Sequence, residues 1–534
     1  MRERLIGDWL ARANERSFQI PFCWWLTAQG YRVLHMTRHS AMELGKDIIA
    51  IGPDGKTPFV YQLKGTQSRI TMSVWRGELQ GQLFDAAYAA PVHPSLPADA
   101  PHHRTFLVTN GSLDEEVSQV IKNINDQCVK DGRPEKQIST IVGLEMLAGF
   151  IEMAEEFWPT DLVDTRTYLE LYLDDGRGRL AKAKLADLLS STLDLDGESA
   201  WGERRVAQSI AAAALVCSAA TEGFVRESNW VALFEAWTIF LSSLLACAEK
   251  RALPAKLWIP WAELASDIMR QHLRGLVDEI RTRDGIIDGH PFVEKLTLHV
   301  KMVELAGLVA LFCLWSKDDV DAERREYAES WLRRNVDKIM LPGEYAAPLY
   351  FTVASWFRRR DATVKPDVML LRAIDTILAR NGPTELPALM NPYYDADDVL
   401  MAESGLDSVD EDFKGASYAL SSFVYVLARR MWKSPLVDRW DQITRVDRRE
   451  FVPDGRMDWL RWRRRESGEY VSATWEQPQQ WMELLGRARL DDVSRLPSSL
   501  MNNVFWYLSF VSVYPHRFSD DGARWADSQL WEQA

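Results

Sequence analysis

The chain has 534 residues, of which 47% are hydrophobic and 26% are charged. A single hydrophobic core stops growing at about 250 to 300 residues, so this length excludes a single-core protein and predicts two or more domains. The composition is that of an ordinary globular protein and excludes a disordered or fibrous chain. The five cysteines occur without a CxxC pair, which indicates neither a zinc knuckle nor a disulfide framework and favours a reducing cytoplasm.

The formal net charge of -14 is distributed unevenly along the chain. Residues 1–150 contain equal numbers of basic and acidic side chains, so the negative excess lies in the remainder. A negative balance weakens non-specific attraction to phosphate, but a local basic cleft can still hold a nucleic-acid backbone. The overall charge therefore does not exclude nucleic acid as a partner of the first part.

The longest apolar stretch, Trp230 to Cys247, is about as long as a bilayer-spanning helix, but it contains Glu235 and three hydroxyl residues. We expect it to be a buried core helix. Residues 1–8 mix basic and acidic side chains without an apolar run, which argues against a secretory signal. We therefore expect a cytoplasmic protein with no membrane segment.

The first 130 residues alternate helical and strand patterns in an order that defines an α/β domain with a mixed sheet. Two of the predicted strands flank the turn residues Pro53, Asp54 and Gly55, which predicts a hairpin. The last helix of this part is expected to be capped by Ser112. The predicted helices cover residues 1–30, 73–90 and 113–128, and the predicted strands cover residues 31–36, 47–51, 59–64 and 105–108.

Beyond about residue 138 the strand patterns end, and the periodicity predicts helices alone. The sequence DGRPEKQ at residues 131–137 has the character of a linker. We therefore predict an α/β domain over residues 1–135 and an all-α domain over residues 136–534 that recognises a partner or regulates the first domain. The predicted helices cover residues 138–157, 203–221, 230–249, 258–283, 293–315, 321–339, 368–379 and 417–432.

Asp47, Gln62 and Lys64 form a candidate site at one end of the predicted hairpin. With a turn near residues 54–55, Asp47 lies opposite about Leu63, while Gln62 and Lys64 project from one face of their strand. The neighbouring side chains are apolar, so three polar groups are costly there without partners or a metal ion.

The chemistry of phosphodiester hydrolysis explains these residue types. Mg²⁺ prefers oxygen ligands, and Asp47, the Gln62 amide and the Leu63 carbonyl can supply them. Such an ion lowers the pKa of a bound water and neutralises the phosphate, while the Lys64 ammonium orients that water or stabilises the transition state. We therefore predict Asp47, Gln62 and Leu63 as ligands of Mg²⁺ or Mn²⁺, and Asp47, Gln62 and Lys64 as catalytic residues.

The segments GKDIIAI, GPDGK and FVYQLKG resemble the central hairpin of PD-(D/E)XK nucleases, particularly Mrr-like restriction endonucleases, whose last motif often reads QxK. FQIPFCWWLTAQGYRV resembles the first helix of this family, and RTFLVTNGSLDEEV resembles its later strand, turn and helix. The resemblance covers about residues 10–130 and implies a restriction-endonuclease-like fold, cleavage of DNA, and a role in bacterial restriction or anti-phage defence. RNA is the alternative substrate. An inactive binding or scaffold protein is the alternative class, because Gln62 stands where many relatives carry Glu.

Relatives commonly carry a glutamate on the first helix, and the position of the GY pair places Gln19 there. Glu15 lies one helical turn earlier on the same face. We predict Glu15 as the additional active-site carboxylate, with Gln19 and Glu43 as alternatives.

A basic run in the second part, with Arg461, Arg463 and Arg464 next to Trp459 and Trp462, could bind a phosphate backbone with stacking. The alternative is a charged helix face with its Trp side chains directed inward. The resemblance also leaves room for a partner protein encoded nearby and for an oligomer.

Overall fold

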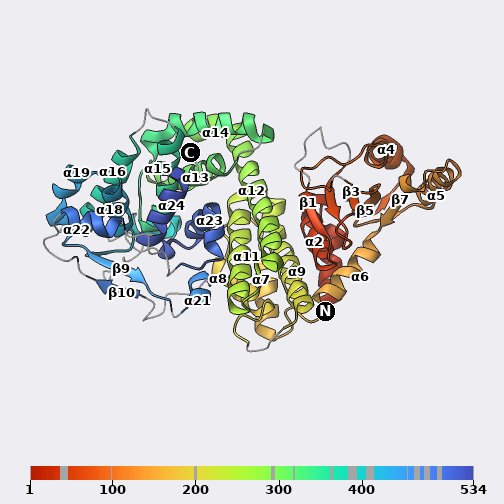
Figure 1. Ribbon diagram of the computed structural model, residues 1–534, viewed down its shortest axis with the longest axis horizontal. Coiled ribbons are helices and arrows are strands. Elements are labelled where there is room, and N and C mark those ends of the chain that lie inside the picture. Colours follow the sequence, from red (N-terminus) through yellow and green to blue (C-terminus); the bar gives the residue numbers. More distant parts are fainter. Residues whose placement is uncertain are drawn as a thin grey trace. The chain divides into compact units, whose positions relative to one another are not determined.

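The computed structural model describes residues 2–36, 46–97, 99–197, 201–289, 295–316, 319–360, 365–382, 394–403, 414–453, 455–461, 470–473, 475, 481–489 and 496–532. Within these residues, an N-terminal part built on a five-stranded sheet precedes a mostly helical region (Figure 1). The chain divides into two compact units: Met1–Cys247 with Leu253–Gln271, and Ala248–Ala252 with His272–Ala534.

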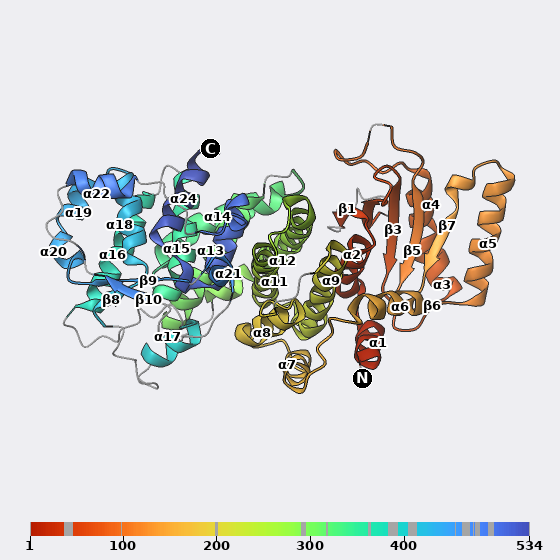
Figure 2. The same ribbon diagram turned by 60° about the horizontal axis from the view of Figure 1, so that its bottom comes forward.

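The five-stranded sheet of the first unit has the order β1-β2-β3-β5-β7 and is mixed, as predicted. The strands β1 (Arg32–Met36), β2 (Ile48–Ile51) and β3 (Pro58–Lys64) form an antiparallel meander. The strands β5 (Arg104–Thr109) and β7 (Ile138–Ile141) continue the sheet in parallel with β3. Figure 2 shows the sheet from β1 at one edge to β7 at the other.

Two helices, α1 (Arg2–Arg12) and α2 (Glu15–Ala28), replace the single helix predicted over residues 1–30. Asn14 interrupts the helix because its side chain accepts a hydrogen bond of 2.9 Å from the Ser17 N–H, which caps the start of α2. Glu15 is therefore the first residue of a helix.

One face of the sheet is covered by α2. Tyr61 of β3 lies 5.4 Å from Phe22 of α2 and 5.2 Å from Phe106 of β5, measured between ring centroids. Phe59, two residues before Tyr61, lies on the same face, 6.0 Å from Phe106. These aromatic contacts hold α2 against the central strands.

The opposite face is covered by α4 (Gln80–Tyr88) and α5 (Glu115–Lys130), which bury a cluster that includes Leu107 of β5. Gln62 pairs with Leu107 in the parallel ladder, and paired residues of neighbouring strands share a face. Gln62 and Lys64 therefore project toward the side of the sheet that carries α4.

The helix predicted over residues 73–90 is present but has an unpredicted irregularity. It begins as α3 (Met72–Val74), passes through a π-helical turn at Trp75–Leu79 and continues as α4. Such turns are rare and occur frequently at functional sites.

The predicted cap of the next helix is wrong. Ser112 lies in a short strand, β6 (Ser112–Leu113), which pairs with β4 (Arg69–Ile70). The helix α5 begins two residues later than predicted, and Asp114 precedes it. The hydroxyl residue was mistaken for a cap because the two-residue strand has no recognisable pattern.

The first unit extends beyond the boundary predicted at residue 135. β7 belongs to its sheet, and the helix predicted over residues 138–157 begins only at α6 (Gly143–Ala154). Trp24 of α2 stacks on Trp261 at 4.8 Å and lies 5.1 Å from Phe240. A fragment of residues 1–135 would lose an edge strand and expose Trp24, so we expect that it does not fold alone. The four residues of β7 are too few and too polar to give a clear strand pattern.

The second unit is mostly helical but not all-α as predicted. A three-stranded sheet contains β8 (Ala416–Ser417), β9 (Asp447–Phe451) and β10 (Tyr470–Ala473) in the order β10-β9-β8. β9 reads DRREF and lacks the apolar alternation by which strands are recognised. The larger helices of the second unit are α13 (Lys295–Trp315), α14 (Ala322–Asn335), α15 (Ala347–Arg360), α16 (Pro366–Asn381), α18 (Leu420–Arg429), α23 (Val504–Val513) and α24 (Asp520–Glu532).

The apolar helix α11 (Trp230–Lys250) is long and apolar enough to cross a membrane, by length and composition only. Its most apolar window is 89% buried inside the structure, which agrees with the predicted core helix. All five cysteines are buried, and none of them forms a disulfide bond.

Candidate active site

The hairpin brings Asp47 and Gln62 to the same face of the sheet. The Asp47 N–H donates to the Tyr61 carbonyl at 2.9 Å and continues the pairing of β2 with β3. Asp47 therefore stands opposite Gln62, one residue away from the predicted partner, Leu63. Because opposite residues share a face, this register places Asp47 on the same side as Gln62 and Lys64. The predicted register would have separated them.

The predicted metal ligands form one hydrogen-bonded group. Asp47 and Gln62 are only 8% and 5% exposed. The Asp47 Oδ2 accepts hydrogen bonds of 2.6 Å from both the Gln62 Nε2 and the Leu63 N–H. The Gln62 Nε2 also lies 3.2 Å from the Leu63 carbonyl oxygen. The Gln62 Oε1 is buried and has no hydrogen-bond partner in the described structure.

The orientation of the Gln62 amide decides whether this group can hold a cation. As oriented, its NH₂ group faces the Asp47 carboxylate and the Leu63 carbonyl, the two other oxygens predicted to bind metal. A half-turn of the amide exchanges its oxygen and nitrogen with little change of shape and would direct three oxygens toward one another. Three oxygens repel each other unless a cation lies between them, so these residues fit a hard divalent ion.

Among the described residues, no group of three or more His, Cys, Asp and Glu side chains is placed to hold a metal. The candidate group differs from such a cluster because it combines one carboxylate, one amide and one main-chain carbonyl. Mg²⁺ commonly keeps several waters and binds proteins through one or two carboxylates. Asp47, Gln62 and Leu63 could thus supply only part of the coordination, with water or substrate oxygens supplying the rest.

Lys64 is paired with a carboxylate that the sequence pattern does not single out. Its Nζ donates to the carboxylate of Glu78, which lies on the π-helical turn before α4. The Lys64 side chain is 27% exposed and that of Glu78 is 58% exposed. The hydrogen bond from Lys64 lowers the pKa of Glu78. This ammonium is therefore held in place near the surface, where a phosphate group can reach it.

Glu15 reaches the end of β3, as its predicted role requires. The Gly65 N–H lies 3.4 Å from the Glu15 Oε2. A Cβ on Gly65 would lie 2.6 Å from the main-chain nitrogen of Glu15, so this close approach requires glycine. Gln19, the alternative, is 3% exposed, and its Nε2 has no partner within the described residues. Glu43, the third candidate, lies outside the described residues.

Asn110 fixes the position of Glu15 and was not predicted. At the end of β5, its Oδ1 accepts a hydrogen bond of 2.9 Å from the Thr66 N–H. Its Nδ2 donates to the carbonyls of Leu10 and Ala13, both at 2.8 Å. Asn110 thereby ties the segment after β3 to the break between α1 and α2. The TNG sequence after β5 was the available signal, although it does not reveal these partners.

Lys46 places a second cation next to Asp47 in the chain. It is 4% exposed, and burial lowers the pKa of its ammonium while the charge of Asp85 raises it. A lysine directly before an apolar strand could have been recognised from the sequence as unusual, because lysine is rarely buried.

The nucleic-acid contact predicted for the second unit stays a prediction. Arg461 follows the helix α21 (Arg456–Leu460) and is half-buried. Trp459 is 3% exposed, as expected of the alternative with inward Trp side chains. Arg463 and Arg464 lie outside the described residues.

No known protein family matches the sequence, and no characterised protein or solved structure matches the chain. The restriction-endonuclease-like fold therefore stays a prediction from the sequence.

Proposed function

We propose that the chain is a metal-dependent endonuclease that hydrolyses phosphodiester bonds in DNA. The observation that carries the proposal is the meeting of Asp47, Gln62, Lys64 and Glu15 at one end of β3. Such a buried polar group is costly for the fold, and the unpartnered Gln62 Oε1 leaves part of that cost unrelieved. The resemblance to PD-(D/E)XK nucleases rests on the same residues and supports a role in bacterial restriction or anti-phage defence.

Asp47, the Gln62 amide oxygen and the Leu63 carbonyl would hold Mg²⁺ or Mn²⁺. When bound, the ion supplies Lewis acidity, which activates water and neutralises charge on the scissile phosphate. The Leu63 N–H fixes the Asp47 carboxylate. The Lys64 ammonium projects from the same face and stabilises the negative charge that develops on the phosphate oxygens.

The two glutamates have different roles in this proposal. Glu15, held at Gly65, accepts a hydrogen bond from the attacking water or removes its proton. Glu78 is a positioning residue, because it holds the Lys64 ammonium and can release it to a phosphate, which binds lysine more strongly than a half-exposed carboxylate does.

Incubation of the purified full chain with supercoiled plasmid, single-stranded DNA and RNA tests the proposal. With Mg²⁺ or Mn²⁺ we expect nicked and linear plasmid, and with EDTA we expect no cleavage. Cleavage of RNA alone would assign the alternative substrate. Cleavage of none of these substrates would support the inactive binding or scaffold protein, motivated by Gln62 at a position where many relatives carry Glu.

The second unit, in the same proposal, recognises a partner or restrains the nuclease. Light scattering of the purified chain, alone and after mixing with proteins encoded nearby, measures whether it forms an oligomer or a complex. If the monomer cleaves DNA at full rate without any partner, the second unit neither binds a required partner nor restrains the nuclease. Substrate recognition would then be its remaining role.

A further inference from the structure

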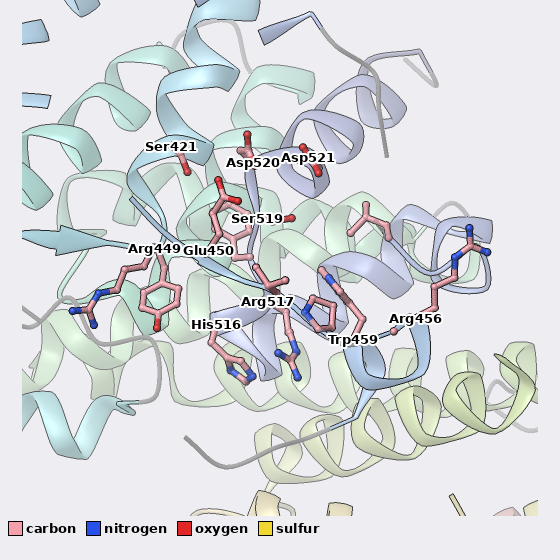
Figure 3. A pocket seen from close by; sticks show the side chains of 16 residues that line it. Ser421, Arg449, Glu450, Arg456, Trp459, His516, Arg517, Ser519, Asp520 and Asp521 are labelled. Carbon is pink, nitrogen blue, oxygen red and sulfur yellow. The ribbon is translucent and has the colours of Figure 1, made fainter. Parts of the chain in front are cut away.

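The second unit contains a cavity of about 520 Å³ beside β9 and the start of α24 (Figure 3). Pockets that bind small molecules have volumes of about 300 to 1,000 Å³. Side chains of α18 and α21 complete the walls. The cavity is therefore large enough for a small organic ligand.

One end of the cavity is acidic. Figure 3 shows Glu450 and Asp520 near one another at this end. Burial raises the pKa of Asp520, the charge of Arg524 lowers it, and the charge of Glu450 raises it further. The Arg524 Nη2 lies 3.7 Å from the Asp520 Oδ2, and the Arg448 Nη1 lies 3.7 Å from the Glu450 Oε1. The negative charge of two neighbouring carboxylates favours a cation placed between them.

Ser421 provides a neutral polar group at the acidic end. It is 2% exposed, and Figure 3 shows its side chain directed into the cavity. A hydroxyl oxygen has two lone pairs and can accept a hydrogen bond from an ammonium group. Ser421 is therefore placed to contact a cation held at the acidic end.

The other end of the cavity is basic. His516 and Arg517 are 2% and 1% exposed and lie on the side of the cavity opposite Asp520 in Figure 3. The Arg517 Nη2 donates to the carbonyls of Asp458 at 3.2 Å and Arg461 at 3.1 Å. These bonds fix the guanidinium in place, and a fixed guanidinium favours an anionic group.

Aromatic side chains also line the cavity. They are Tyr418, Trp459 and Phe518, each less than 5% exposed. Aromatic faces attract both apolar groups and organic cations.

We propose that this cavity binds a small zwitterion with an apolar or aromatic body. Its ammonium group lies between Glu450 and Asp520 and donates to the Ser421 hydroxyl. Its carboxylate or phosphate lies toward Arg517 and His516. The site is separate from Asp47 and Lys64, so the proposal does not depend on nuclease activity.

Isothermal titration of the full chain with three probes of matched shape tests the two ends separately. The probes are L-phenylalanine, which has both charges, phenethylamine, which has only the cation, and 3-phenylpropionate, which has only the anion. We expect L-phenylalanine to bind most tightly, because it can use both ends. Tightest binding of 3-phenylpropionate, or saturable binding of none of the three at millimolar concentration, would overturn the proposal.

Variants then assign the acidic end. We expect Glu450→Gln and Ser421→Ala each to weaken L-phenylalanine and phenethylamine about tenfold, the loss of one charge-assisted hydrogen bond, and to leave 3-phenylpropionate unchanged. Glu483→Gln is the matched control, because Glu483 is exposed on α22 (Trp481–Ala488) and does not line the cavity. Thermal unfolding shows whether each variant is folded. Equal affinity of L-phenylalanine for the wild type and for both folded cavity variants would contradict the assignment.

Discussion

Buried charge is organised differently in the two units. In the second unit, Arg430 donates to Asp367 at 2.6 Å and to Asp527 at 2.5 Å, and Asp527 also accepts from Arg358 at 2.7 Å. Burial acts against the charge on Asp527, but its two arginine partners lower its pKa overall. Each member of this network has an oppositely charged partner within the fold.

In the first unit, the group formed by Asp47, Gln62 and Lys64 is open, because not every polar atom in it has a partner buried within the fold. Gln62 uses its NH₂ group for two bonds while its Oε1 has no partner in the described structure. Lys64 is paired with a half-exposed glutamate that solvent can reach. Buried charge alone therefore does not define a functional site. A closed network stabilises the fold, whereas an open one retains binding capacity for a ligand.

The largest effect should come from removing the Lys64 ammonium beside Asp47 and Gln62. We expect Lys64→Ala to lower kcat about a hundredfold to a thousandfold, because a transition-state partner of the phosphate is lost. The free energy of unfolding should change by less than about 1 kcal/mol, since the pair with Glu78 is partly exposed. The control is Lys56→Ala in the exposed hairpin turn, which should keep wild-type activity. Wild-type turnover by folded Lys64→Ala would remove Lys64 from the site.

The network of Arg430, Asp367 and Asp527 should instead have its main effect on the free energy of unfolding. We expect Arg430→Met to lower the free energy of unfolding by about 3 to 5 kcal/mol, because Asp367 loses a buried partner and Asp527 loses one of two. Urea unfolding measures this change. Arg439→Met is the matched control, because its pair with Asp375 is more exposed and should contribute at most about 1 kcal/mol. Equal losses in the two variants would show that closure and burial do not distinguish these pairs.

Glu344 of the second unit is a buried carboxylate that has hydrogen-bond donors but a raised pKa. It is 1% exposed and accepts hydrogen bonds from Ser417 and the Tyr418 N–H, yet burial raises its pKa to about 7. Because the folded protein holds this proton more tightly than the unfolded chain, the stabilisation is present below about pH 4.3 and is lost as the pH rises through 7.

This loss amounts to about 4 kcal/mol at 1.4 kcal/mol for each pKa unit. Urea unfolding at pH 5 and pH 8 should therefore show a smaller fall in stability for Glu344→Gln than for the wild type. The control Glu483→Gln should behave as the wild type does. An identical fall in Glu344→Gln and the wild type would show that Glu344 is ionised in the fold at both pH values.

The smallest effect on activity is expected for the two candidate residues of α2, Glu15 and Gln19. We expect Glu15→Gln to lower kcat about tenfold with little change in KM, because the amide keeps the hydrogen bond from Gly65 but loses the charge. Gln19→Ala should have less effect. The reverse ranking would assign the role to Gln19. Small, equal effects would leave Glu43 as the remaining candidate.

Local chemistry explains which parts of the site could be predicted from the sequence. The hairpin was predictable because Asp54 and Gly55 have the properties of a turn. The Asp54 side chain accepts hydrogen bonds from the Lys56 and Thr57 N–H groups, and Gly55 has a positive φ of 71°. Asp47 and the QxK pair follow from strand alternation. The register was predicted one residue wrong, because spacing alone does not fix which residues face each other.

The remaining features depend on contacts between segments that are distant in sequence. Glu78 belongs to the site because a π-helical turn directs it to Lys64, and Asn110 belongs to it through three distant main-chain groups. β7 and β9 were missed because their residues do not alternate clearly. The helix break at Asn14 could have been found, since an asparagine is a frequent N-cap.

The most direct test measures metal binding and cleavage on the same protein. Isothermal titration with Mn²⁺ and plasmid cleavage are compared for the wild type, for Asp47→Asn and for the exposed-loop control Asp99→Asn. We predict that the wild type and Asp99→Asn bind Mn²⁺ and cleave DNA, whereas folded Asp47→Asn does neither. Binding and cleavage by Asp47→Asn at wild-type levels would contradict the assignment of this hairpin as the active site.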